Sequence, residues 1–147
     1  MSTLVALTPD EAAALSDDQF QQAFEQVEMD VKAFNHEQHV RLAWLYLKQF
    51  DLQEAFRRYK TALIKFATAW GYPGLYHETI TWYYLNLINQ AMQKPDCPNE
   101  WPIFRDQNPT LLAKSPPVIF NYYSKDLIAS KKARATIVEP DIRPLQG

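Results

Sequence analysis

The stretch "AFNHEQHVRLAWLYLKQFDLQEAFRRYKTALIKFATAWGYPG", residues 33–74, decides the fold class. Asn35 and Asp51 each precede an amphipathic run, and side chains of both types cap the free backbone amides at a helix start. In the second run, apolar residues recur every three or four positions, which is the period of a helix. We therefore expect helices over about 35–50 and 51–70, with a short connection that makes them antiparallel.

The flanking segments extend this pattern in both directions. Gly71 and Pro73 end the second helix, because Gly tolerates the left-handed conformation of a C-terminal cap and Pro cannot continue a helix. A further helix is expected from about residue 75 to 93. On the other side, Ser16 precedes two acidic residues and an apolar stripe, which predicts an earlier helix.

The last third of the chain has a different composition. Residues 94–117 are rich in Pro and polar turn residues, so we expect a loop-like path with short helical turns around Asn108. Residues 118–147 are expected to form one more helix, capped near Ser124, followed by an extended tail.

These patterns together predict an all-α fold class. The chain has 147 residues, of which 47% are apolar, and this is typical of one globular domain. We expect residues 1–147 to form a single domain, a bundle of four or five main helices with its core at about residues 8–93.

Charge and cysteine content exclude several function classes. The net charge of −2 gives no sign of the basic surface that a nucleic-acid-binding protein needs. No stretch is long and apolar enough to predict a membrane span. The single cysteine, Cys97, excludes an internal disulfide, and the N-terminus lacks the pattern of a signal peptide. We expect a soluble cytoplasmic protein, and its aromatic helix faces leave a homodimer open.

The three histidines all stand at the starts of apolar helices. His36 and His39 are three residues apart, so both imidazoles lie on one helical face. His77 opens the helix after the 71–74 turn. All three rings can converge if the helices over 35–50 and 75–93 begin at the same end of the bundle, which requires the helix over 51–70 to run antiparallel to the first.

Three neutral imidazoles with an open position form a ligand set for zinc, and related sets hold iron or copper. We therefore expect His36, His39 and His77 to bind one divalent transition metal, Zn, Fe or Cu. Such a metal lowers the pKa of its bound water, or holds dioxygen or substrate. Zinc implies hydrolysis or elimination, whereas iron or copper implies oxidative chemistry.

The residues beside these histidines complete the candidate site. Glu78 is a candidate general base or additional ligand, and Tyr76 and Tyr46 are candidates for hydrogen bonding or proton transfer. Nearby aromatic side chains suit an apolar or aromatic substrate; the candidates are Phe34, Trp44, Tyr46, Tyr76 and Tyr84. The first hypothesis is thus a small metal-dependent enzyme that acts on a small organic molecule.

A structural interpretation of the same residues is the alternative. Histidines at helix starts often satisfy backbone carbonyls, and His77 would then donate to a loop carbonyl. Glu37 and Arg41 would pair across one turn of a solvated helix start. The chain would then be a non-catalytic helical binding or adaptor protein, with residues 95–117 as its partner-docking surface.

Two histidine blocks carry a resemblance to a known group of sequences. "FNHEQHVRLAWLYL" and "YHETITWYYL", and more loosely "YYSKDLIASKKARATIVEPDIRPL", resemble a family of small all-helical bacterial proteins of unassigned activity. The shared signature is F-x-H-x-x-H-x-R-L-A-W followed by Y-H-E-T-x-T, and the resemblance as a whole covers residues from about 34 to 145. The resemblance implies that both blocks belong to one site, and it implies no particular reaction.

Overall fold

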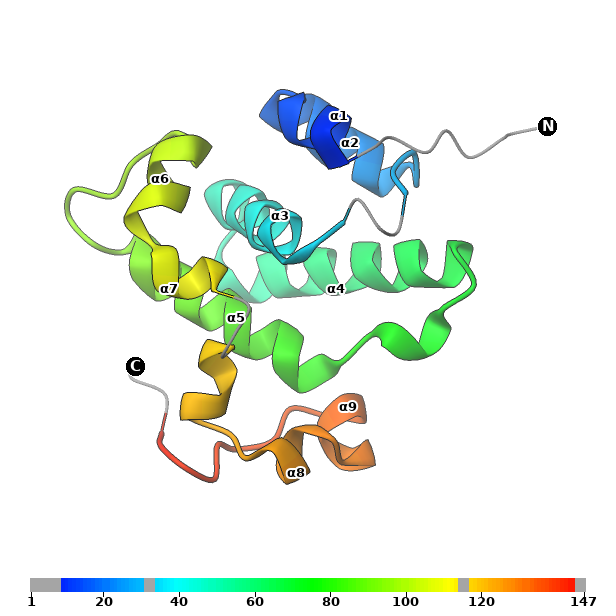
Figure 1. Cartoon of the computed structure of the whole chain (residues 1–147), viewed down its shortest axis with the longest axis vertical. Coiled ribbons are helices and arrows are strands. Elements are labelled where there is room, and N and C mark those ends of the chain that lie inside the picture. The colour runs from blue at the N-terminus through cyan, green and yellow to red at the C-terminus, as the bar shows by residue number, and fades with distance from the viewer. Residues whose placement is uncertain (1–8, 31–33, 114–116, 145–147) are drawn as a thin grey trace. The chain divides into compact units, whose positions relative to one another are not determined.

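The computed structural model describes residues 9–30, 34–113 and 117–144, and Figure 1 shows the course of the chain. These residues form α-helices and short 3-10 helices and contain no β-strand, which confirms the predicted all-α fold. None of the helices they form has both the length and the apolar character needed to cross a membrane. The chain divides into two compact units, Met1–Tyr76 and His77–Gly147.

The first unit is a set of α-helices followed by one 3-10 turn. Its elements are α1 (Pro9–Ala14), α2 (Asp17–Glu25), α3 (His36–Gln49), α4 (Leu52–Ala69) and the 3-10 helix η1 (Pro73–Leu75). Helices α3 and α4 pack against each other and α2 packs against both. A hydrogen bond of 3.0 Å from the Tyr59 hydroxyl to the His39 carbonyl joins α4 to the first turn of α3.

The predicted caps begin the helices of this unit. The side chains of Ser16, Asn35 and Asp51 each accept a hydrogen bond from the backbone amide three residues later. At Ser16 the bond is reciprocal, because the Gln19 side chain accepts from the Ser16 amide. Capping depends on neighbours in sequence, so these helix starts could be predicted without knowledge of the fold.

Two helices of this unit end in the same hydrogen-bonding motif. At the end of α4 the amides of Gly71 and Tyr72 donate to the carbonyls of Thr68 and Ala67, with Gly71 at a φ of 84°. The end of α2 repeats the motif with Val27 in the left-handed position, at a φ of 57°. A β-branched residue is strained there, and Val27 is buried, so its packing offsets the strain.

Aromatic rings form the centre of the first unit. Phe24, Phe34 and Phe66 come from three separate segments and their ring centroids lie 4.4 to 5.4 Å apart. All three side chains are buried. Contacts of this kind combine the burial of large apolar area with favourable ring geometry, so they hold α2, the start of α3 and α4 together.

The second unit is built around one long helix. Its elements are α5 (Glu78–Met92), α6 (Trp101–Gln107), α7 (Pro109–Leu112), the 3-10 helix η2 (Val118–Asn121), α8 (Lys125–Ile128) and α9 (Lys131–Ala135). Helix α5 packs against α7, η2 and α9. A buried cluster has residues from α5, η2 and α8 and consists of Tyr83, Val118, Ile119, Tyr123 and Ile128.

Three expected boundaries in this unit need correction. Helix α5 begins at Glu78 and not near residue 75, because η1 and His77 come first. Residues 94–117 contain the two-turn helix α6 as well as a short turn after Asn108. The single helix expected after residue 118 is instead η2, α8 and α9, because Ser130 caps a new helix after the one that Ser124 caps.

The predicted number of main helices is confirmed. Within the described residues, five α-helices have seven residues or more: α2, α3, α4, α5 and α6. The assignment of residues 1–147 to one domain stays a prediction. Each unit has its own interior, and the division falls at the junction between Tyr76 and His77.

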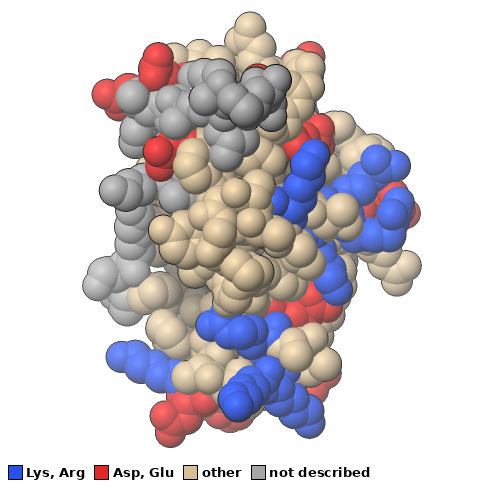
Figure 2. All heavy atoms as spheres, turned by 90° about the vertical axis from the view of Figure 1, so that its right-hand side faces the viewer, with Lys and Arg blue, Asp and Glu red and all other residues tan. Residues whose placement is uncertain are grey.

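Charged side chains are mixed on the face that Figure 2 draws. Lys and Arg atoms there form several small groups with Asp and Glu atoms beside them, separated by uncharged surface.

Candidate functional site

The structure places two of the three histidines in the first turn of α3. His36 is the first residue of the helix, and His39 follows on the same face. The His39 ring packs on Phe34, with their centroids 3.9 Å apart. Burial, together with the nearby His36, lowers the pKa of His39 from 6.5 to about 3. The His39 imidazole is thus neutral at pH 7.

His77 lies in the second unit, where it forms the N-cap of α5. Its Nδ1 accepts a hydrogen bond of 3.1 Å from the Ile80 amide. Its Nε2 lies 2.8 Å from the carbonyl oxygen of Ile128, which accepts only, so Nε2 carries the proton and donates. The side chain is buried. Each ring nitrogen therefore has a backbone partner, and the single lone pair of the neutral ring, on Nδ1, already accepts a hydrogen bond.

The structure brings His36 and His39 together on α3 and places His77 in the other unit. Within the described parts of the chain, no three or more His, Cys, Asp or Glu side chains are grouped so that they could hold a metal ion. Convergence of the three imidazoles stays a prediction. For His77, metal binding requires that the bond to Ile80 or the bond to Ile128 be given up.

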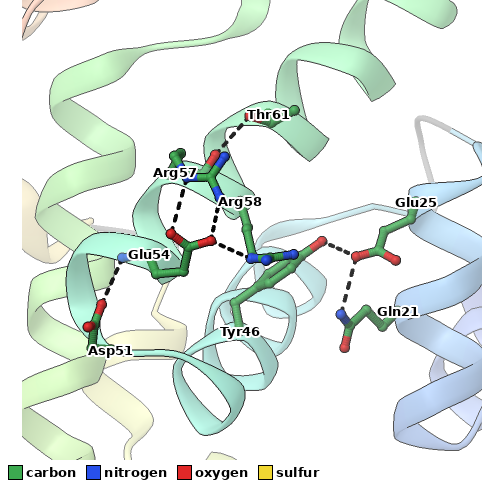
Figure 3. Close-up of polar contacts among 8 residues, drawn as sticks. All are labelled: Gln21, Glu25, Tyr46, Asp51, Glu54, Arg57, Arg58 and Thr61. Atoms are coloured by element: carbon green, nitrogen blue, oxygen red, sulfur yellow. Dashed lines mark hydrogen bonds and ion pairs between the residues drawn. The ribbon is translucent and has the colours of Figure 1, made fainter.

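Tyr46, a candidate for proton transfer, is buried on α3 and donates its hydroxyl to Glu25 of α2 (Figure 3). Gln21 donates to the same Glu25 oxygen at 3.2 Å, and Gln49 donates to Gln21 at 2.6 Å. Burial and the hydrogen bond to Glu25 raise the pKa of Tyr46. The phenol therefore keeps its proton and links α2 to α3.

Tyr76 and Glu78 flank His77 in the sequence. Tyr76 is the last residue of the first unit and Glu78 is the first residue of α5, and both are partly buried. A carboxylate in the first turn of a helix is stabilised by the positive end of the helix dipole, whatever its further role. The role of Glu78 as a general base or additional ligand and the role of Tyr76 in hydrogen bonding or proton transfer stay predictions.

Several of the expected substrate-lining residues take part in packing. Phe34 and Trp44 are buried, and Phe34 contacts other rings of the first unit. The Trp44 ring is covered by the Lys48 ammonium, which lies 4.3 Å from the ring centroid. Tyr84 packs edge-on against Tyr83 in the second unit. These rings contribute to the two interiors.

Arg41 has other partners than the structural interpretation expected. Its Nη2 donates to Asp17 at 3.0 Å and to the Leu15 carbonyl at 2.8 Å. Its guanidinium also lies over the Phe20 ring, 4.5 Å from the centroid. The expected pair with Glu37 is therefore not the contact that holds this side chain. Arg41 is buried and ties the junction of α1 and α2 to α3.

Thr79 is a polar residue whose role the sequence did not reveal. Its side chain is fully buried, and its hydroxyl lies 2.7 and 2.8 Å from the carbonyl oxygens of Ala133 and Thr136. The same oxygen accepts from the Val138 amide at 3.2 Å. The partners lie 54 to 59 residues away in sequence, and no local pattern indicates such a contact.

Comparison with known protein families, with curated proteins and with solved structures finds no match. The resemblance of the two histidine blocks to a bacterial family stays a prediction.

Proposed function

We propose that this chain is a non-catalytic helical binding protein in which the histidines have structural roles. The observation that supports this most directly is His77, whose two ring nitrogens bond to the backbone of Ile80 and Ile128. One bond begins α5 and the other attaches the end of α8 to it. A buried imidazole used in this way stabilises the fold and has no lone pair left for a metal.

His39 supports the same proposal. Its ring packs on Phe34, which contacts the rings of Phe24 and Phe66 in the interior of the first unit. Desolvation keeps the imidazole neutral over the physiological range of pH. The neutral, partly buried ring therefore extends the aromatic packing around Phe34.

The segment 95–117 is the proposed partner-docking surface. Helix α6 anchors it, because Trp101 and Phe104 are buried in the protein. The opposite side of the helix exposes Pro102 and Ile103, and 45% of the Ile103 surface is accessible. An apolar residue presented on a rigid helix is a suitable anchor for a protein partner. Cytoplasmic location and a homodimer stay parts of the proposal.

The metal-dependent enzyme is the second candidate. In its favour, His36 and His39 share one helical face, and the neutral His39 is in the protonation state that ligates metals. Zn, Fe or Cu would then bind at this pair, with Glu78, Tyr76 and Tyr46 as candidate catalytic residues for a small apolar or aromatic substrate. His77 joins the ligand set only if it leaves a backbone partner.

Metal analysis of the purified, untagged protein by plasma mass spectrometry tests the two candidates. The samples are the wild type and the variants His36→Ala, His39→Ala, His77→Ala and His77→Asn, before and after incubation with zinc, iron and copper. The proposal expects no stoichiometric metal in any sample. Near-stoichiometric metal in the wild type that is lost in His36→Ala and His39→Ala would overturn it and establish the second candidate.

The His77→Asn variant distinguishes the role of His77 as an N-cap from a role as a metal ligand. An Asn side chain also accepts from a backbone amide at a helix start, so it preserves the N-cap. If His77 is structural, His77→Asn is more stable than His77→Ala. If His77 is a ligand, both variants lose metal to the same extent.

A further inference from the structure

The chain after α9 crosses the surface of the second unit without helical structure. We call residues 136–143 the strap. Its backbone is held at several points by hydrogen bonds to other parts of this unit. The Val138 amide donates to Thr79 at 3.2 Å, and the Val138 carbonyl accepts from the Tyr123 hydroxyl at 3.0 Å. Contacts to backbone groups hold a chain of any sequence, so they give affinity and not specificity.

The end of the strap is bound in the same manner. The amides of Ile142 and Arg143 both lie within hydrogen-bond distance of the Tyr122 carbonyl, at 2.9 and 3.3 Å. The Arg143 guanidinium lies over the Tyr122 ring, 5.6 Å from its centroid. Because Tyr122, Tyr123 and Thr79 belong to the folded unit, the strap contacts a surface that α5 and η2 already position.

Two strap side chains add specificity. Val138 packs against the buried cluster that contains Tyr83 and Tyr123. Three residues later, the Asp141 carboxylate accepts from the Ser124 amide at 2.7 Å and from the Ser124 hydroxyl at 2.6 Å. These charge-assisted bonds lower the pKa of Asp141. The recognised pattern is a β-branched apolar residue followed three positions later by a carboxylate.

The strap buries little of its own surface. Val138 and Pro140 are partly buried, and its other residues are exposed. Segments with few buried apolar contacts open at a small fraction of the global unfolding free energy. Hydrogen bonds, among them the two that Ser124 donates to Asp141, are therefore a large part of what holds the strap in place.

We propose that the strap is an intramolecular ligand on a surface that binds extended peptides with a carboxylate in the place of Asp141. This strap-binding surface consists of Thr79, Tyr122, Tyr123 and Ser124. A partner segment with the Val138–Asp141 pattern displaces the strap and makes the same contacts. Because the strap is tethered, its effective concentration is high, and the wild-type protein is therefore largely self-occupied.

The proposal adds a second binding surface to the proposed binding function, different from segment 95–117, and rests on contacts that do not involve the histidines. The two can therefore fail separately. Metal analysis decides between a structural and a ligating role for the histidines, and peptide binding decides whether the strap is an exchangeable ligand.

The test uses the full-length protein and a fluorescent peptide with the sequence of residues 136–144, TIVEPDIRP. Asp141→Asn weakens the strap and leaves the strap-binding surface intact. Glu139→Gln is the matched control, because it removes an equal charge from an exposed position two residues away. We expect Asp141→Asn to bind the peptide at least about tenfold more tightly than the wild type or Glu139→Gln, by fluorescence anisotropy.

Hydrogen exchange shows whether the strap has opened. In Asp141→Asn the amides of Val138, Ile142 and Arg143 should exchange faster than in Glu139→Gln, while the amides of α5 remain protected. Faster exchange without stronger peptide binding would overturn the proposal. The proposal would also be overturned if, in Asp141→Asn, the strap amides exchanged as slowly as the amides of α5. The strap would then be part of the core. A peptide with Asn in place of Asp should bind more weakly.

Discussion

Arg41 of α3 donates to Asp17 at the start of α2, 24 residues earlier in the chain, with 3.0 Å between Nη2 and Oδ1. The Arg41 side chain is 5% exposed and that of Asp17 is 39% exposed. A guanidinium removed from water to this degree requires a partner, because an unpaired buried charge is strongly destabilising. The pair therefore fixes α2 against α3.

The variant Asp17→Ala tests this pair. It leaves Arg41 with the Leu15 carbonyl and the Phe20 ring as its partners, and we expect the free energy of unfolding to fall by about 2 kcal/mol. Asp18→Ala is the matched control, because Asp18 is an exposed acidic residue in the same first turn of α2. Urea unfolding measures the free energy of unfolding of both variants. Equal losses of stability would show that Asp17 acts through the helix dipole and not through Arg41.

A second prediction concerns His77 as the N-cap of α5. His77→Ala removes the acceptor for the Ile80 amide and the donor to the buried Ile128 carbonyl, so unfolding should become easier by about 2 kcal/mol. His77→Asn preserves the cap and should recover about 1 kcal/mol of this loss. Thermal and urea unfolding are the measurements. A His77→Ala variant as stable as the wild type would contradict the structural role.

The helices were predictable to the extent that local sequence determines them. Asn35, Asp51 and Ser16 cap helices in the structure because a cap bonds to a residue three positions away. Ser130 shows the limit of such reasoning. A Ser is tolerated inside a helix as well as at its start, and the short helix after it packs against α5 and is joined by its Ala133 carbonyl to the hydroxyl of Thr79. That contact depends on the tertiary structure.

The candidate site was predictable only in part, for the same physical reason. The helical spacing of His36 and His39 places them on one face, as expected. The partners that define the other roles are distant in sequence: Ile128 for His77 and Glu25 for Tyr46. The alternative interpretation expected a loop carbonyl as a partner of His77, whereas the carbonyl found there belongs to Ile128, the last residue of α8. No periodicity could identify which carbonyl it would be.

A third prediction follows from the phenol of Tyr46. Burial and the bond to Glu25 raise the pKa of this hydroxyl, so it acts as a donor between α3 and α2. Tyr46→Phe should lower the free energy of unfolding by about 1 kcal/mol. Tyr72→Phe is the control, since 52% of the Tyr72 surface is exposed and the change there should be close to zero. Equal effects in urea unfolding would argue against a linking role for Tyr46.

The final prediction is a dependence of stability on pH that comes from His39. Its pKa is about 3 in the folded protein and 6.5 in the unfolded chain, so between these values the unfolded chain binds a proton that the folded protein does not. Stability is therefore full above pH 6.5 and falls as the pH drops toward 3. One such proton contributes a slope of at most about 1.4 kcal/mol per pH unit.

His77 contributes in the same direction, because burial lowers its pKa as well. Urea unfolding between pH 7 and 5 therefore compares the wild type with His39→Gln, His77→Asn and the double variant, in a range where most carboxylates stay ionised. The free energy of unfolding should depend less steeply on pH in each single variant than in the wild type, and least steeply in the double variant. A slope unchanged in His39→Gln would mean that the folded protein accommodates a proton on His39, which would contradict a desolvated ring packed on Phe34.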